Sequence, residues 1–600
     1  MMKTHRMLAS LFLAGPIALL SGCGSGGTLT SSPEFSGKVM ANLQPVIGAS
    51  VQLYLTGTSG NGSAPTALLT SALTTDSSGS FTVPGNYSCP AKSLVYIIAT
   101  GGKPGASSTN NSALSLMAVL GPCGSLSTST TVVVNEVTTV ASVYALAPFL
   151  STGGNVGATS TNTVGISNAF LTAANLATMS TGVSPGAGLA STISVPSSRL
   201  NTLANALTPC TGSGSCTALF TAATVGNSVP ANTLDAAFNI VRHPAANVAA
   251  IYALAASPVF TPALSAAPPD WMMHVTLSGG GMNDPASVGV DASGNVWVSS
   301  YNKVVSEFSP AGVPVSASGF TGSGINQSYG MALDINSNVW IANEQTTSNS
   351  GLGDITELNA SGQPLTGASG LTAGGIYFPI AVTADPNGNI WIVDYGDSSV
   401  TLLNSSGAPL SGSSGWTNPA LEFPVALAVD SNHNAWVANQ AANTITKISA
   451  NGITFTPIAC CDGASGIASD QSSNLWVANY YGDSVSLVSN AGVVLSSGFT
   501  GGGVLHPQGI AVDSAGTVWV ANYHGNSISE LSGASTASPG TPLSPSPGFG
   551  SDAALSNPYG LALDASGNAW VSNSGNNTLT QFVGVATPIK TPFAGPPTTP

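Results

Sequence analysis

The chain has 600 residues, of which only 6% are charged, and its 24 acidic and 10 basic residues give a formal net charge of −14. Six hundred residues exceed what one ordinary hydrophobic core can organise, so we expect several domains. From residue 271 onward Lys303, Lys447 and Lys590 are the only lysines or arginines. Three cations cannot neutralise a nucleic-acid backbone, which excludes nucleic acid as a partner.

The N-terminus has the pattern of an export signal. Lys3 and Arg6 precede an apolar run from Met7 to Leu20, followed by the sequence LSGC that ends at Cys23. The run is shorter than the ~20 residues of a membrane span. Because LSGC resembles the bacterial lipobox, we predict a lipoprotein signal peptide over residues 1–22, lipidation of Cys23 and a flexible linker over residues 23–34. A simple secretory leader with an unrelated cysteine is the alternative.

This reading predicts a protein exported and lipid-anchored to the cell envelope, at the outer membrane or the cell surface. Its membrane contact would be the lipid anchor only. Six cysteines follow Cys23 in what should be an oxidising compartment. Proximity in the sequence favours two disulfides, Cys89 with Cys123 and Cys210 with Cys216. Cys460 and Cys461 are adjacent and would form either a strained vicinal disulfide or two buried thiols, of which we prefer the thiols.

Two regions precede the repeats. Residues 35–130 contain period-two patterns such as ASVQLYL at 49–55 and LVYIIA at 94–99, which predict a small β-sandwich. The order GKV at 37–39, PVIGA at 45–49 and TTDSSGSF at 74–81 resembles the carboxypeptidase-regulatory-like (transthyretin-like) modules, which are usually spacers or adhesive units. Residues 131–268 are rich in alanine and leucine at helical spacing, as in NTLDAAFNIV at 232–241, and predict a helical domain.

A repeat fills residues 271–585. Seven segments place an aspartate six residues before a tryptophan, as in DASGNVWVSS at 291 and DQSSNLWVAN at 470, with successive spacings of 43, 51, 45, 40, 43 and 51 residues. Each unit reads as a strand, a turn containing the aspartate, a second strand through the tryptophan and a third strand. Both faces of the tryptophan strand are apolar, so each sheet needs neighbours on both sides. Blades stacked around an axis meet this need, and the sequence predicts a mainly β protein with a seven-bladed β-propeller.

Closure of the ring is also predicted. Residues 274–279 resemble the fourth-strand segments of other units, so we expect them to complete the last blade, with a proline-rich tail over residues 586–600. The motifs resemble NHL repeats, in particular those of propellers related to virginiamycin B lyase.

The predicted strand directions place the seven aspartate turns on one rim and a ring of amides on the other. The expected ligand-binding rim combines the residues after each tryptophan triplet with nearby tyrosines: Asn343, Asp394, Asn439, Asn479, Asn522, Asn573, Tyr395, Tyr480 and Tyr523. These side chains could hold sugar hydroxyls or, with the carboxylates of Asp394, Asp397 and Asp483, a Ca²⁺ or Mg²⁺ ion at the channel mouth. Alternatively, each asparagine only caps its own strand.

Two function classes follow. The resemblance to virginiamycin B lyase implies Mg²⁺-assisted elimination by a histidine and a glutamate, and His506 and His524 are the candidates for a catalytic base. No glutamate accompanies them, because asparagine replaces the acid that the lyases carry after the aromatic triplet. The leading hypothesis is therefore a non-enzymatic module that binds a glycan, peptide or protein. A metal-dependent lyase or a lactonase is the alternative.

Overall fold

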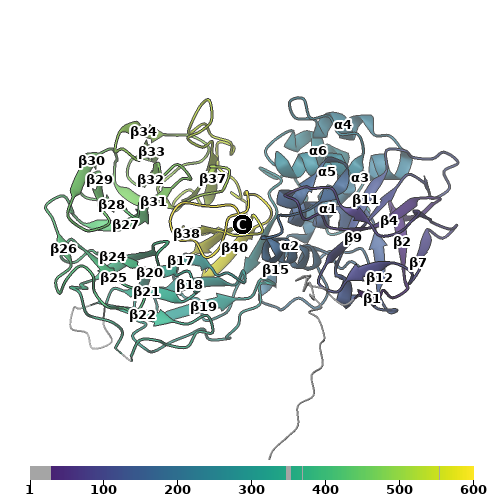
Figure 1. Ribbon diagram of the computed structural model, residues 1–600. Helices are drawn as coiled ribbons and strands as arrows, with labels where there is room; N and C mark the ends of the chain where they lie inside the picture. The colour runs from purple at the N-terminus through teal and green to yellow at the C-terminus, as the bar shows by residue number, and fades with distance from the viewer. Residues whose placement is uncertain (1–28, 346–352, 368, 553–554) are drawn as a thin grey trace, which may run out of the picture.

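The computed structural model describes residues 29–345, 353–367, 369–552 and 555–600. The predicted signal peptide and Cys23 lie outside the described residues. The chain is mainly β, and Figure 1 shows its N-terminal sheets and helices (purple to blue) on one side and a succession of sheets (teal to yellow) on the other. No helix in the described ranges combines the length and apolar character needed to cross a membrane.

Two five-stranded sheets form the N-terminal part. They enclose a shared core in which Val39, Val51, Phe81 and Ile97 are buried. The strands of the first sheet are β2 (Phe35–Ala41), β3 (Gln44–Ile47), β7 (Ser80–Val83), β10 (Lys103–Pro104) and β12 (Thr131–Val134). Those of the second are β4 (Ser50–Leu55), β5 (Thr66–Ala67), β6 (Leu73–Thr74), β9 (Leu94–Thr100) and β11 (Ser115–Pro122). A separate pair joins β1 (Leu29–Ser31) to β8 (Ser88–Pro90).

Helices follow, as the alanine and leucine spacing predicts. They are α1 (Glu136–Leu146), α2 (Thr163–Leu176), α3 (Ser197–Ser213), α4 (Thr217–Ala223), α5 (Thr233–Arg242) and α6 (Val248–Leu254). α1 is buried along its whole length and contacts α2, α3, α5 and β11. Asn135 caps it, accepting a hydrogen bond from the Thr138 N–H while the Thr138 side chain accepts one from the Asn135 N–H. Short elements complete the region: η1 (Cys123–Ser125), η2 (Ala147–Phe149), η3 (Thr152–Gly154), β13 (Leu150–Ser151) and β14 (Asn155–Val156).

Seven antiparallel sheets, called sheets 1 to 7, make up the C-terminal part. Sheet 1 contains β17 (Pro285–Val290), β18 (Val296–Ser300) and β19 (Val304–Phe308). Sheet 2 contains β20 (Ser328–Leu333), β21 (Val339–Asn343) and β22 (Asp354–Leu358). Sheet 3 contains β23 (Pro379–Ala384), β24 (Ile390–Asp394), β25 (Ser399–Leu403) and β26 (Trp416–Thr417). Sheet 4 contains β27 (Pro424–Val429), β28 (Ala435–Asn439), β29 (Thr444–Ile448) and β30 (Phe455–Ala459). Sheet 5 contains β31 (Ala464–Ser469), β32 (Leu475–Asn479), β33 (Ser484–Val488) and β34 (Val494–Phe499). Sheet 6 contains β35 (Pro507–Val512), β36 (Val518–Asn522) and β37 (Ser527–Leu531). Sheet 7 contains β38 (Pro558–Leu563), β39 (Ala569–Asn573) and β40 (Thr578–Phe582).

The repeated aspartate makes the same turn in every sheet. In sheet 5, one carboxylate oxygen of Asp470 accepts hydrogen bonds from the N–H groups of Ser472 and Asn474 at 2.8 and 2.9 Å. The other six aspartates accept from the residues two and four positions on in the same way. The tryptophan six residues later is buried in each sheet. The aspartate therefore fixes the turn that leads into the buried second strand.

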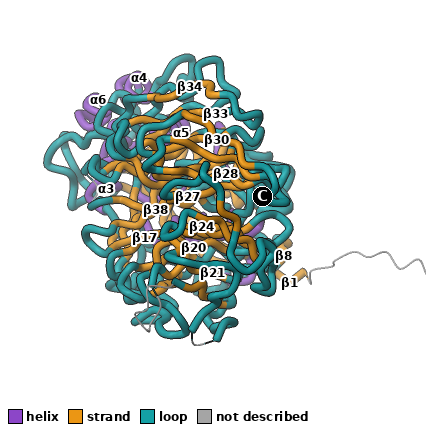
Figure 2. Tube along the Cα trace, turned by 90° about the vertical axis from the view of Figure 1, so that its left-hand side faces the viewer, coloured by secondary structure: helices purple, strands orange, loops and turns teal. Residues whose placement is uncertain are grey.

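The sheets form a propeller-like ring. The first strand of each sheet contacts that of the next, and β38 of sheet 7 contacts β17 of sheet 1. In Figure 2 the first strands β17, β20, β27 and β38 lie toward the middle of the sheets and β33 and β34 toward the periphery. At the seam the side chain of Asn577 in sheet 7 accepts a hydrogen bond from the Asp284 N–H in sheet 1 at 2.7 Å.

The seam is closed by a segment that precedes the ring in the sequence. β16 (His274–Leu277) pairs with β40 of sheet 7, as predicted, and β15 (Ile193–Ser194) from the helical region pairs with β16 as a fifth strand. The two parts of the chain also share a core that includes Tyr144, Trp271 and Trp570. The Tyr144 hydroxyl donates to the Trp271 carbonyl at 2.5 Å. The ring is thus attached to the helical region by both strand pairing and packing.

Three disulfides are present. Cys89 pairs with Cys123 and Cys210 with Cys216, the two pairs that proximity in the sequence favours. Cys460 and Cys461 are also joined. The preference for two thiols at this position was therefore wrong, because the turn between β30 and β31 brings the two sulfur atoms together.

The tail over residues 586–600 runs across the aspartate-turn rim of the ring. The Thr587 N–H donates to the Asp513 carboxylate of sheet 6 at 2.9 Å, and the Thr591 hydroxyl donates to the Asp291 carbonyl of sheet 1 at 2.9 Å. Farther along, Gly595 lies against Pro386 of sheet 3. Tail residues Ile589, Thr591 and Phe593 line a cavity of about 240 Å³ together with first-strand residues of all seven sheets. The tail therefore occupies that end of the central channel.

Candidate functional site

The opposite end of the channel holds a larger cavity of about 640 Å³. Every sheet contributes first-strand residues to its wall, and the residues that follow the second strand form its outer part. The side chains that matter for recognition are Tyr329, Glu344, Tyr395, Gln440, Tyr480, Gln508, Tyr523 and Tyr559, which we call the mouth residues. A cavity of this size and shape suits a ligand of a few hundred Å³.

A backbone contact repeated in all seven sheets positions the outer mouth residues. The residue just before each first strand has positive φ, as in Phe378 (51°), Phe423 (49°) and His506 (46°). Its carbonyl accepts a hydrogen bond from the residue just after the second strand, for example from the Tyr480 N–H to Gly463 at 2.8 Å and from the Tyr523 N–H to His506 at 3.1 Å. The mouth residues therefore stand on a rigid backbone.

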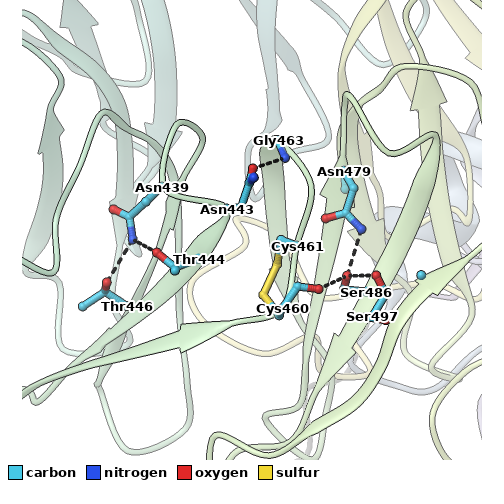
Figure 3. Close-up of a disulfide and its surroundings, with 12 residues drawn as sticks. Asn439, Asn443, Thr444, Thr446, Cys460, Cys461, Gly463, Asn479, Ser486 and Ser497 are labelled. Carbon is cyan, nitrogen blue, oxygen red and sulfur yellow. Dashed lines mark hydrogen bonds between the residues drawn. A yellow bond between two sulfur atoms is a disulfide. The ribbon is translucent and has the colours of Figure 1, made fainter.

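The amide ring predicted for this rim is buried beneath the mouth residues. Asn343, Asp394, Asn439, Asn479, Asn522 and Asn573 have no exposed surface. Their side chains bond to hydroxyls on the third strand of the same sheet. Figure 3 shows two examples: the amide of Asn439 donates to Thr444 and Thr446 at 3.1 and 2.9 Å, and that of Asn479 donates to Ser486 at 2.8 Å.

These contacts are those of strand caps, the second of the two alternatives. A ligand in the cavity cannot reach the amides unless the sheet opens. The prediction that these amides contact the ligand was therefore wrong, and the residues that follow them in the chain form the rim instead. Three of these, Tyr395, Tyr480 and Tyr523, belong to the predicted rim and line the cavity.

The vicinal disulfide lies in the loop that supports one side of the mouth. Cys460 and Cys461 lead from β30 to β31, and the Ser486 hydroxyl donates to the Cys460 carbonyl at 3.1 Å (Figure 3). The Asn443 side chain accepts from the Gly463 N–H at 2.8 Å. Since Gly463 in turn accepts a hydrogen bond from the Tyr480 N–H, this loop holds the backbone that carries Tyr480.

An aromatic belt follows the mouth across five of the seven sheets. Ring centroids are separated by 5.5 Å between Tyr301 and Tyr329, 5.9 Å between Tyr329 and Tyr559, 6.2 Å between Tyr559 and Tyr523, and 6.5 Å between Tyr523 and Tyr480. The belt spans sheets 1, 2, 7, 6 and 5. Burial raises the pKa of the Tyr329 and Tyr480 hydroxyls and that of Tyr559 most strongly, so these phenols stay neutral at physiological pH.

The two candidate catalytic histidines meet at the end of this belt. The rings of His506 and His524 are 4.7 Å apart, and the Tyr480 hydroxyl lies 3.1 Å from His524 Nε2. His506 Nδ1 lies 3.3 Å from a carboxylate oxygen of Asp483, which also accepts from the His506 N–H at 2.7 Å. The structure thus brings together the residues that the sequence proposed, beside the cavity wall formed by Tyr480 and Tyr523.

One charged side chain, Glu344, lines the cavity within the described ranges. Burial raises its pKa, whereas a hydrogen bond with the Tyr301 hydroxyl lowers it. The mouth is otherwise polar and aromatic. It therefore suits a ligand that presents hydroxyls and apolar faces.

The donor set does not fit the Ca²⁺ or Mg²⁺ ion considered for this rim. The described residues contain no group of three or more histidine, cysteine, aspartate or glutamate side chains able to share an ion. Asp394 is buried and accepts from Thr401 at 2.9 Å and from the Tyr377 N–H at 3.2 Å. Asp483 is engaged with His506. Glu344 alone does not supply the six or more oxygen atoms that these ions require.

Five mouth residues were missing from the prediction: Tyr329, Gln508 and Tyr559 on first strands, and Glu344 and Gln440 after second strands. A usable signal was present in each case. Glu344 and Gln440 occupy the same repeat position as Tyr395, and Tyr329, Gln508 and Tyr559 each follow the first residue of a first strand. The burial of the amide ring also had a signal in the sequence. In sheets 3 to 7 a serine or threonine stands both five and seven residues after the amide or acid.

No protein-family model and no curated protein sequence matches this chain. Among solved structures, virginiamycin B lyase from Staphylococcus aureus is similar over 51% of this chain and 98% of its own, with 16% identity and a TM-score of 0.41. A streptogramin B lyase is similar over 51% and 97%, with 14% identity and a TM-score of 0.40. Hydrazine synthase from Kuenenia stuttgartiensis is similar over 50% and 95%, with 10% identity and a TM-score of 0.38. At these values the similarity assigns neither a reaction nor a ligand to this chain.

Proposed function

We propose that this chain is an exported, lipid-anchored binding protein of the cell envelope, whose seven-bladed NHL-type β-propeller takes up a ligand at the channel mouth. In this proposal the N-terminal sheets are a carboxypeptidase-regulatory-like sandwich that acts as a spacer from the lipid anchor on Cys23. The ligand is a glycan in preference to a peptide or protein. The observation that carries this choice is the belt of tyrosines around a cavity of about 640 Å³.

The chemistry of the wall supports a glycan. Sugar rings present apolar C–H faces that stack on tyrosine, together with hydroxyls that exchange hydrogen bonds with phenols and amides. The Tyr480 and Tyr523 rings offer faces on which a sugar ring can stack, and Gln440 and Gln508 supply side-chain amides in the same cavity. A single carboxylate among the described lining residues leaves little to attract a highly charged ligand.

The test is a binding screen with the full mature chain against N-acetylglucosamine oligomers and peptidoglycan fragments. We expect at least one glycan to bind, and Tyr480→Ala or Tyr523→Ala to weaken binding about tenfold, equivalent to ~1.4 kcal/mol. The matched control is Tyr481→Ala, since this tyrosine is 64% exposed and does not line the cavity. Absence of binding to every glycan, or equal loss in the control, would contradict the proposal.

The second candidate is a lyase or lactonase, favoured by one observation: the contact between His506, His524 and the Tyr480 hydroxyl. A histidine held in this way could remove a proton from a ligand in the cavity. Incubating the same protein preparation with Mg²⁺ and a streptogramin or a lactone distinguishes a binding protein from an enzyme. Turnover that is abolished by His524→Ala would replace the binding proposal with an enzymatic one.

A further inference from the structure

A separate cavity of about 430 Å³ lies between the helical region and sheets 6 and 7, away from the channel mouth. One wall comes from the helical side and includes Pro148 and Arg242, the last residue of α5. The other wall comes from the ring and includes Asp513, Trp519 and Glu530. Acidic and basic side chains therefore face the same space from different parts of the chain.

Sheet 4 holds a lysine at the equivalent position, whereas sheets 1, 2 and 6 hold a glutamate. In sheet 4, Lys447 lies opposite Trp436 in the strand register, with its ammonium 4.7 Å from the centre of the Trp436 ring and 3.8 Å from the turn carboxylate of Asp430. A cation over an indole ring and beside a carboxylate is stabilised by both. Sheet 4 thus supplies its own ammonium to the aspartate turn.

Sheet 6 has an acid in place of that lysine. Glu530 pairs with Trp519 in the strand register, as Lys447 pairs with Trp436 in sheet 4. The turn carboxylate of Asp513 is close enough to Glu530 to act on its charge. The Asp513 side chain accepts from Thr587 at 2.9 Å. No described residue forms a hydrogen bond or ion pair with the Glu530 carboxylate. Two acids and an indole therefore surround a space that no ammonium of the described residues fills.

Two further features describe the side chains of this wall. Trp519 is 1% exposed, and its indole N–H has no hydrogen-bond partner among the described residues. Burial, followed by the charge of Asp513, raises the pKa of Glu530 to about 8. In a half-buried acid whose pKa is raised in this way, an incoming cation stabilises the ionised form.

We propose that this cavity binds a small zwitterion of the size of a free amino acid or dipeptide. Its ammonium group would lie over the Trp519 ring between Asp513 and Glu530, as Lys447 lies over Trp436, and its carboxylate would pair with Arg242 on the facing wall. A ligand bound in this way bridges the helical region and the ring. This site is independent of the glycan site proposed at the channel mouth.

The experiment is calorimetric titration of the full mature chain with the common free amino acids and glycylglycine, at mildly alkaline pH. Methylamine and acetate serve as probes that carry only one of the two charges. We expect at least one zwitterion to bind at least about tenfold more tightly than either single-charge probe, and Glu530→Gln or Arg242→Gln to weaken that binding about tenfold. Glutamine keeps the shape of each wall, and a melting curve verifies that each variant is folded.

Glu307→Gln is the matched control. Glu307 occupies the same register position opposite Trp297 in sheet 1, and burial together with Asp291 raises its pKa to about 7, but it does not line this cavity. We expect Glu307→Gln to bind like the unmodified chain. The proposal is overturned if no zwitterion binds, if methylamine binds as tightly as the zwitterions, or if Glu530→Gln and the control behave alike.

Discussion

Asp394 occupies the position that asparagine fills in five of the other six sheets. It has no exposed surface, and burial raises its pKa from 3.8 to about 8, partly offset by hydrogen bonds from Thr401 and Tyr377. The folded chain therefore retains a proton that the unfolded chain releases above about pH 4. The stability that this proton contributes is complete below the unfolded pKa and is lost as the pH rises through the folded pKa of about 8.

We expect Asp394→Asn to raise the melting temperature at about pH 9 and to change it little at about pH 5, because an amide makes the same cap without ionising. Asn479→Asp is the reciprocal variant, which should lower the melting temperature at about pH 9 more than at about pH 5. Melting curves at the two pH values test both. Equal effects of Asp394→Asn at both pH values would argue against the buried acid as their source.

The disulfides differ in the length of chain that they enclose. Cys89 and Cys123 are 34 residues apart, whereas Cys460 and Cys461 are neighbours. A cross-link stabilises mainly by restricting the unfolded chain, so Cys89→Ala with Cys123→Ala should cost about 4 kcal/mol. Cys460→Ala with Cys461→Ala should cost less than ~1 kcal/mol, since no loop is closed. Denaturant unfolding of both double variants measures the difference, and a larger loss at Cys460 and Cys461 would contradict this account.

The strands of the ring could be predicted because their pattern occurs seven times. An aspartate turn followed by a buried tryptophan has one local solution, and the structure repeats it in every sheet. The seam could also be predicted, since residues 274–277 pair with β40. The fifth strand, Ile193–Ser194, could not, because two residues carry no period and their pairing depends on how the helical region packs.

The candidate site was harder to predict than the strands. Tyr480, Tyr523, His506 and His524 were identified as neighbours of a shared rim, and they do lie together. The burial of Asn479 could not be read from its own position, because it depends on hydroxyls of the third strand, Ser484 and Ser486. Side-chain direction at a strand end depends on such partners and not on the residue type alone.

At the scale of the whole molecule, the tail is held on the ring by Ile589. Its side chain is 3% exposed and belongs to a core shared with sheets 6 and 7, whereas Phe593 is 40% exposed. We expect Ile589→Ala to cost about 2–4 kcal/mol and Phe593→Ala less than ~1 kcal/mol. Thermal unfolding and protease susceptibility of residues 590–600 measure the two effects. Equal sensitivity of the two variants would show that the tail is not anchored at Ile589.

The tail also limits how a long ligand could be recognised. Because residues 589–595 occupy the far end of the channel, a polymer cannot thread through the ring and must enter and leave on the same side. Such a blind socket accepts a chain terminus or a short branch, but not the middle of a straight polymer. If the ligand is a polysaccharide, shortening it while keeping the same end should preserve affinity, whereas masking that end should abolish binding.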